Sequence, residues 1–157
     1  QRDDGPSCLI FSRQNLPHQS RDEAQLLDIA RGGYVLKDSA GTPDVILIAT
    51  GSEVQLAVEA RARLAAEGVQ ARVVSAPSLE WFDEQDAAYR EHVLPAAITA
   101  RVSVEAGIAM PWRGIVGDRG RSVSIEHFGA SADYKTLFQK FGITTDAVVA
   151  AAHEVLG

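Results

Sequence analysis

Residues 44–53 read Asp-Val-Ile-Leu-Ile-Ala-Thr-Gly-Ser-Glu and carry the clearest fold signal in this 157-residue chain. The unbroken apolar run at 45–49 predicts a strand that is covered on both faces. Gly51 turns the chain, Ser52 is placed to cap a helix, and Glu53 lies in the first turn of that helix, which apolar spacing predicts over 53–67. A buried strand that leads directly into an amphipathic helix is the repeating unit of α/β domains.

The same alternation of strand and helix continues on both sides of this unit. Further strands are predicted at 34–37, 69–75, 98–105 and 122–125, and further helices at 82–94, 112–116, 132–141 and 145–156. Strands and helices that alternate at this spacing are joined by right-handed crossovers. We therefore predict an α/β fold, a three-layer domain with a mostly parallel sheet and helices on both faces, beginning near residue 34.

The chain before residue 34 is patterned more weakly. Residues 7–12, Ser-Cys-Leu-Ile-Phe-Ser, form an apolar run that predicts a short buried strand, with Cys8 inside it as a small hydrophobe. Residues 16–33 are polar and are expected to be a linker with a helical turn or two within 22–29.

Composition excludes several classes of protein. The net charge of −6 argues against generic attraction to nucleic acid or to an anionic membrane. The apolar run at 45–49 is too short to span a bilayer, and the start of the chain has no signal-peptide pattern. A single cysteine, Cys8, excludes an intrachain disulfide and favours a reducing compartment. Because the chain opens at Gln1 without Met, we expect it to be a piece of a longer protein.

The ends of the predicted strands are the first place to look for a site. Ligands of open α/β sheets bind beyond the carboxyl ends of the strands, which fall at 50–52, 76–78 and 105–107. The first of these ends is also a helix N-terminus, which favours an anion. The carboxylate of Glu53 would repel a phosphate there while satisfying the helix itself, so self-capping is preferred over anion binding.

Other candidate motifs favour structural roles. Gly114, Gly117 and Gly120 lie three apart but precede a strand, whereas a dinucleotide-binding loop leads into a helix. The histidines have no His or Cys neighbour at metal-ligand spacing, so surface or structural roles are favoured: His18, His92, His127 and His153. Arg13, at the end of the first apolar run, has a fork of donors that suits a phosphate or a carboxylate, although a surface salt bridge is the simpler role.

Several ordered blocks of the sequence resemble the transketolase family. The resemblance begins with Gly-Pro-Ser-Cys-Leu-Ile-Phe-Ser-Arg-Gln-Asn-Leu-Pro at 5–17. It continues through blocks at 29–36, 48–54, 71–75, 85–90, 104–109 and 128–132, and so covers nearly the whole chain. The family usually has a proline where this chain has Asp133, which bears only on the turn at that position.

This resemblance implies a division of the chain and a function. Residues 1–17 would be the last strand of the middle, pyrimidine-binding domain, 18–33 a linker, and 34–157 the C-terminal domain. The full enzyme would be a cytoplasmic homodimer that transfers a two-carbon ketol unit between sugar phosphates. It would use thiamine diphosphate and a divalent cation, Mg or Ca, both bound outside this chain.

The same resemblance implies one substrate contact in this chain and places the catalytic residues outside it. Arg13 matches the family's sugar-phosphate contact, and no catalytic, cofactor-binding or metal-binding residue is expected here. The isolated chain is therefore expected to be inactive, and the run at 7–12, without its parent sheet, to be disordered, packed on its own domain or paired with another chain. Two alternatives stay open: a standalone module that binds a small anion or an effector at the strand ends, and a fragment of the related dihydroxyacetone synthase.

Overall fold

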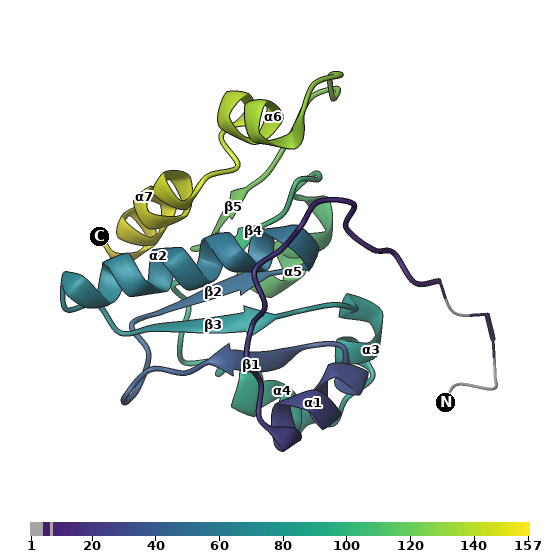
Figure 1. The fold of residues 1–157 in the computed structure, drawn as a ribbon. Coiled ribbons are helices and arrows are strands. Elements are labelled where there is room, and N and C mark those ends of the chain that lie inside the picture. The colour runs from purple at the N-terminus through teal and green to yellow at the C-terminus, as the bar shows by residue number, and fades with distance from the viewer. Residues whose placement is uncertain (1–4, 7) are drawn as a thin grey trace.

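A computed structural model describes residues 5–6 and 8–157. The described residues form one five-stranded sheet in the order β1-β3-β2-β4-β5 (Figure 1). The strands are β1 (Tyr34–Lys37), β2 (Val45–Ala49), β3 (Ala71–Ser75), β4 (Arg101–Val104) and β5 (Arg121–Val123). Only β1 among them runs antiparallel, along β3 at one edge, so the mostly parallel sheet predicted from the sequence is confirmed.

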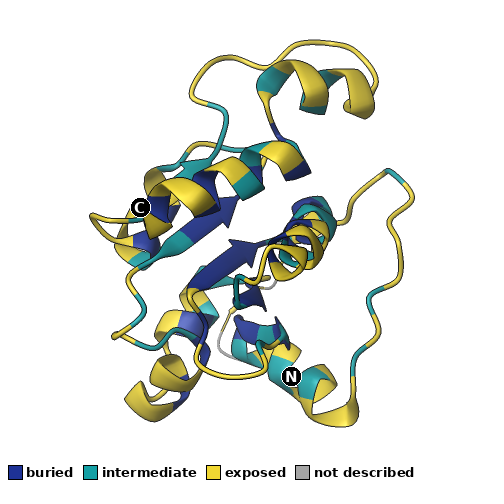
Figure 2. Ribbon diagram, turned by 90° about the vertical axis from the view of Figure 1, so that its left-hand side faces the viewer, coloured by how far each residue is buried: buried dark blue, intermediate teal, exposed yellow. Residues whose placement is uncertain are grey.

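Helices cover both faces of this sheet and complete the predicted three layers (Figure 1). One face carries α2 (Val54–Ala66) and α7 (Thr145–Leu156), and the other carries α3 (Leu79–Asp83), α4 (Ala87–Val93), the 3-10 turn η3 (Met110–Trp112) and α5 (Arg113–Val116). The central strand β2 serves both cores: Val45, Leu47 and Ala49 point to the α2–α7 side, and Ile46 and Ile48 to the other. This is why an unbroken apolar run, rather than an alternating one, marks the strand (Figure 2).

Helices α2 and α7 pack together through small apolar side chains flanked by polar pairs. Ala57 and Ala60 of α2 and Ala152 of α7 are fully buried in the shared core. Side chains spaced four residues apart along α2 each meet a polar partner on α7: Glu59 with Thr145, Arg63 with Asp146, and Glu67 with His153. The hydroxyl of Thr145 donates to Glu59 over 2.7 Å, and Nε2 of His153 lies 2.9 Å from the Glu67 carboxylate.

One predicted strand and one predicted helix are shorter than the sequence suggested. The strand predicted from 98 begins only at Arg101, because the guanidinium of Arg101 donates to the carbonyls of Ile98, Leu94 and Pro95 and so fixes that segment as a loop. The helix predicted over 82–94 is wrong as a single element: α3 ends at Asp83, and α4 begins at Ala87. The carboxylate of Asp86 accepts the backbone N–H of Tyr89 and so starts the second helix.

Replacing this cap should weaken the fold measurably. Asp86→Ala removes the acceptor for the Tyr89 N–H and is expected to lower the free energy of unfolding by about 1 kcal/mol in urea titration. Asp86→Asn, which keeps a capping oxygen, is the control and should stay within a few tenths of wild type. Equal losses in the two variants would show that the charge, not the cap, matters at this position.

The N-terminal part of the described chain contains a correction. Residues 8–12 form no strand in the structure, and Cys8 is exposed rather than buried. Ile10 is 96% exposed, because no neighbouring strand supplies the hydrogen bonds and apolar cover that a buried strand needs. Ser7, the first residue of that predicted strand, lies outside the described residues. The segment crosses the strand ends near the start of α2 and then leads to α1 (Glu23–Asp28) (Figure 1).

The predicted linker docks on the domain. Helix α1 and the turn η1 (Ile29–Arg31) lie within it, as expected from the sequence. The amide of Gln25 donates to the carbonyls of Val35 and Leu36 at 2.9 Å each, which ties α1 to β1. Gly32 ends η1 with a left-handed φ of +81°, and its carbonyl accepts the Ser78 N–H at 3.0 Å. These bonds fix residues 22–33 against the sheet edge.

The last part of the chain forms an arm and the closing helix. Helix α6 (Tyr134–Phe141) stands away from the sheet, and the loop before it carries the exposed Phe128 (Figure 1). Asp133 caps α6 by accepting the Thr136 N–H. Hydrogen bonds from Thr136 lower the pKa of the Asp133 carboxyl.

Candidate functional site

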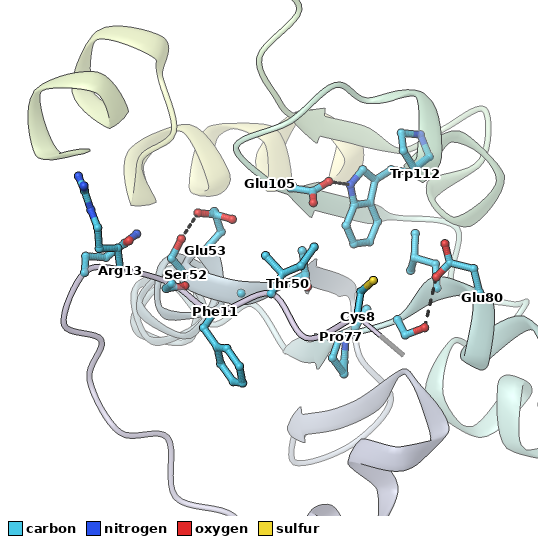
Figure 3. Close-up of a pocket in the computed structure, with 18 residues that line it drawn as sticks. Cys8, Phe11, Arg13, Thr50, Ser52, Glu53, Pro77, Glu80, Glu105 and Trp112 are labelled. Atoms are coloured by element: carbon cyan, nitrogen blue, oxygen red, sulfur yellow. Dashed lines mark hydrogen bonds between the residues drawn. The ribbon is translucent and has the colours of Figure 1, made fainter. Parts of the chain in front are cut away.

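A pocket of about 670 Å³ lies at the carboxyl ends of the parallel strands, where an α/β sheet is expected to hold its site (Figure 3). Its walls come from the loops after β2, β3 and β4 and from the N-terminal segment, which contributes Cys8 and residues 10–14. Arg13 is exposed on the rim formed by that segment, level with the start of α2 (Figure 3). The structure therefore brings the two sequence-predicted candidates, Arg13 and the 50–53 turn, to one pocket.

The turn after β2 differs in detail from the prediction. Gly51 has a left-handed φ of +55° and opens a 3-10 turn, η2 (Gly51–Glu53), before α2. The hydroxyl of Ser52 does not cap the helix. It donates instead to Oε1 of Glu53 at 2.5 Å. The carboxylate of Glu53 also accepts its own backbone N–H and the N–H of Ala106 from the loop after β4. It does not cap α2, so the predicted self-capping of this helix by Glu53 is wrong.

The burial of Glu53 is a feature that the sequence did not reveal. The residue is only 5% exposed although it lies at the rim of a strand-end turn. Burial raises the pKa of the Glu53 carboxyl, the nearby charge of Glu105 raises it further, and the hydrogen bonds from Ser52 and Ala106 oppose the change. A negatively charged group already occupies this helix N-terminus, which leaves an added anion without the favourable field that a free N-terminus offers.

The loop after β4 contributes a second carboxylate with its own partner. Nε1 of Trp112, in η3, donates to Oε2 of Glu105 at 2.7 Å (Figure 3). Trp112 is buried in the core on that face of the sheet. Glu105 lies in the strand end that the sequence predicted at 105–107, but its bond to Trp112 was not predicted, because a tryptophan seven positions after a strand-end glutamate has no local signature. On the opposite wall, the Ser78 hydroxyl donates to Glu80 at 3.2 Å.

The glycine triplet and the basic loop have structural roles. Gly117 ends α5 with a φ of +70°. A side chain at Gly120 would come within 2.5 Å of the Val116 backbone carbonyl, so only glycine fits this turn. Arg121 pairs with Glu154 on α7 at 3.1 Å. Residues 117–119 are exposed, as expected for a surface loop.

The residues present do not suit a metal or a diphosphate cofactor. Within residues 5–6 and 8–157, no three His, Cys, Asp or Glu groups gather as metal ligands. Three of the four histidine rings have described neighbours: His153 pairs with Glu67, His127 stacks edge-on to Phe141, and His92 lies beside Tyr89 with ring centroids 6.5 Å apart. The strand-end pocket is lined by Glu53, Glu80 and Glu105 and, among its described lining residues, by one basic side chain, Arg13 at the rim, which is a poor match for the several charges of a diphosphate.

No helix in the described part of the chain has both the length and the apolar character to cross a membrane.

Comparison with known proteins shows which family the chain resembles over nearly its whole length. The family model described as the transketolase-like TK C-terminal domain matches residues 32–144. Transketolase 1 of Escherichia coli (strain K12) is 62% identical over 156 residues, which is 99% of this chain and 24% of that protein. Transketolase 2 of Aliivibrio fischeri is 58% identical over the same share. The chain thus spans about a quarter of the length of these relatives.

The solved structures that resemble this chain are also transketolases. A transketolase from Leishmania mexicana superimposes with a TM-score of 0.82 at 38% identity, over 92% of this chain and 20% of that one. A chain described as a split gene transketolase, inactive beta4 tetramer, has a TM-score of 0.66 at 25% identity, over 92% of this chain and 48% of its own length. The chain belongs to the transketolase family, and residues 32–144 match that family's C-terminal domain.

Proposed function

We propose that this chain works as the C-terminal portion of a transketolase, an enzyme that transfers a two-carbon ketol unit between sugar phosphates in the pentose phosphate pathway. The observation that carries the proposal is 62% identity over 99% of the chain to an enzyme of that name, a protein about four times longer. In this assignment the chain supplies assembly surface and a substrate-phosphate contact, and other segments supply the chemistry.

The cofactors of the full enzyme would be thiamine diphosphate and a divalent cation, Mg or Ca, held outside this chain. This placement agrees with the described lining of the strand-end pocket, where one basic side chain, Arg13 at the rim, stands against Glu53, Glu80 and Glu105. Thiamine diphosphate, when bound by the full enzyme, would supply the carbanion chemistry of ketol transfer.

Arg13 is proposed to bind the phosphate of the sugar substrate. Its side chain is exposed on the pocket rim, and its guanidinium can bind a phosphate through paired N–H donors. The proposed division follows from the same assignment: 1–17 from the pyrimidine-binding domain, 18–33 as linker and 34–157 as C-terminal domain. The exposed apolar side chains of Leu9, Ile10 and Phe11 support it, since a strand taken from a larger sheet leaves such a surface uncovered.

The full enzyme is proposed to be a homodimer in the cytoplasm, with sugar phosphates as its ligands and with neither nucleic acid nor a membrane as a partner. The net charge of −6 supports the last part, because surfaces that bind polyanions are basic. The lone cysteine, Cys8, agrees with a reducing compartment.

Two proteins test the assignment: the isolated chain, and a chimaera that carries it in place of the matching part of the E. coli relative. The isolated 157-residue chain is expected to show no ketol transfer and no binding of thiamine diphosphate by calorimetry. The inactive tetramer formed by the related split-gene chain is consistent with this expectation. Substituting the chain for the matching quarter of the E. coli relative should give an active chimaera, because the two are 62% identical there. Cofactor-dependent turnover by the isolated chain, or a folded chimaera without activity, would contradict the proposal.

A further inference from the structure

A second pocket, of about 490 Å³, lies beneath residues 16–21, where this stretch of the chain runs across β1 and β3 (Figure 1). Tyr34 and Ser75, which are partners in the antiparallel pairing of β1 with β3, line it from the sheet. Gln55 lines it from the start of α2. A cavity of this volume can take a small molecule.

The place of this pocket in the sheet is one where α/β domains hold ligands. Strands β2 and β3 are parallel neighbours, and the pocket lies at their carboxyl ends. The chain leaves β2 for α2 on one face of the sheet and leaves β3 for α3 on the other face. Neighbouring strands whose connections diverge in this way open a crevice for a ligand.

The described lining of this pocket is basic. His18 and Arg21 belong to it, and it contains neither Asp nor Glu. Two nearby carboxylates are placed elsewhere: Asp22 caps α1 by accepting the Gln25 N–H at 2.8 Å, and Glu53 lines the strand-end pocket. The second pocket is therefore suited to an anion.

Neutral groups hold Arg21 in position. Its Nε donates to the hydroxyl of Tyr34 at 2.7 Å, and its Nη1 donates to the carbonyl of Gln19 at 2.7 Å. The Tyr34 residue is only 2% exposed, so this anchor is part of the core. Within the part of the chain that the structure describes, no carboxylate pairs with Arg21. A guanidinium has five N–H donors, of which these bonds use two, so the charge and three donors remain for a ligand.

Ser75 supplies a buried hydroxyl to the same pocket. The residue is 6% exposed, and its side chain points to the α2 side of the sheet, as those of Ala71 and Val73 do. No hydrogen bond between described residues uses this hydroxyl, and no fully enclosed polar side-chain atom among those residues lacks a partner. The hydroxyl is therefore open to the pocket that Ser75 lines, where a ligand can bond it.

We propose that this pocket binds the phosphate group of a small organic molecule, with Arg21 as the charged partner and Ser75 and Gln55 as hydrogen-bond donors. Donors from the linker, from β3 and from α2 suit the three oxygens of a phosphate group better than a planar carboxylate. Apolar side chains of the lining, such as that of Leu16, would cover the organic part. The site goes beyond the proposed function and is separate from Arg13, so a failure to bind phosphate here would leave the transketolase assignment unaffected.

Titration of inorganic phosphate into the ¹⁵N-labelled 157-residue chain tests this site. With chloride keeping the ionic strength constant, the backbone amide of Ser75 and the side-chain amide of Gln55 should shift and saturate with a millimolar Kd. In Arg21→Gln, whose amide can still donate to Tyr34, these shifts should disappear. Shifts that do not saturate, that persist in Arg21→Gln, or that acetate produces as strongly as phosphate would overturn the proposal.

Two serine variants test the site without changing the charge of the chain. Ser75→Ala should weaken phosphate binding, followed at Gln55, by about 2- to 10-fold, since one neutral hydrogen bond is lost. Ser20→Ala, next to the pocket but outside its described lining, should leave the Kd unchanged. Arg13→Ala should keep the shift at Gln55, because Arg13 lines the other pocket. Equal Kd values in the two serine variants, or loss of the shift in Arg13→Ala, would reject this site.

Discussion

Replacing Arg13 by alanine in an assembled transketolase is expected to raise KM for phosphorylated acceptors by roughly 10- to 150-fold. The reason is the loss of a charge-assisted contact worth about 1.5–3 kcal/mol, at about 1.4 kcal/mol for each factor of ten. The chimaera with the E. coli relative supplies the assembled enzyme for this measurement. Turnover at saturating acceptor should change little, because a phosphate group remote from the reacting carbon contributes mainly to binding.

Two controls separate phosphate recognition from loss of structure. An acceptor aldehyde without a phosphate should show the same KM with Arg13 or alanine at this position. Arg13→Lys should recover part of the lost affinity, since an ammonium supplies charge without the paired donors of a guanidinium. Unchanged KM values for phosphorylated acceptors in Arg13→Ala would remove Arg13 from the substrate site.

Gly32→Ala is expected to be the most damaging addition of a methyl group within residues 18–33. The new Cβ would lie 2.3 Å from the Ser78 carbonyl oxygen and 2.6 Å from the Phe82 nitrogen, both backbone atoms, at a φ of +81°. Left-handed strain and overpacking together should lower the free energy of unfolding by about 2–5 kcal/mol in urea titration.

Gly68→Ala is the matched control for this prediction. Gly68 has nearly the same φ, +86°, but a Cβ there would meet no atom within 4 Å. Gly68→Ala should therefore lower the free energy of unfolding only by the left-handed strain, about 1–2 kcal/mol. The difference between the two variants measures the close approach of the linker to α3, and equal losses would mean that the linker is not docked there in solution. Faster exchange of the Ser78 amide in Gly32→Ala would locate the damage.

The elements that could be predicted from the sequence are those whose signals are local. The apolar run of β2 forms the predicted strand at 45–49, and the helix predicted over 53–67 is found as α2. The break between α3 and α4 also has a local signal, the capping residue Asp86, which the prediction of one helix over 82–94 did not take into account. The strand predicted over 7–12 had the right composition and no partner, because strand formation depends on a neighbour that a local pattern does not contain.

The candidate site was predicted only in outline. The topology rule placed it at the strand ends, and the family resemblance added Arg13. The burial of Glu53 and the bond from Trp112 to Glu105 arise from loops that are far apart in the sequence, so spacing alone could not bring them together. Prediction can also fail between neighbouring residues. Ser52 is a good capping residue, but its hydroxyl donates to the carboxylate of Glu53 and does not cap the helix.

The polar pairs between α2 and α7 determine where the last helix docks, whereas apolar burial determines how strongly it docks. Burial of small apolar side chains is non-directional and would stabilise α7 almost as well one turn along, a slide of about 5.4 Å. Such a slide would separate each polar side chain of α2 from its partner. Exposed pairs add little to total stability, about 0–1 kcal/mol each. These pairs instead select one position of α7. A shifted helix would bury as much apolar surface, but its polar side chains would lose their partners, so its free energy would lie above that of the native arrangement.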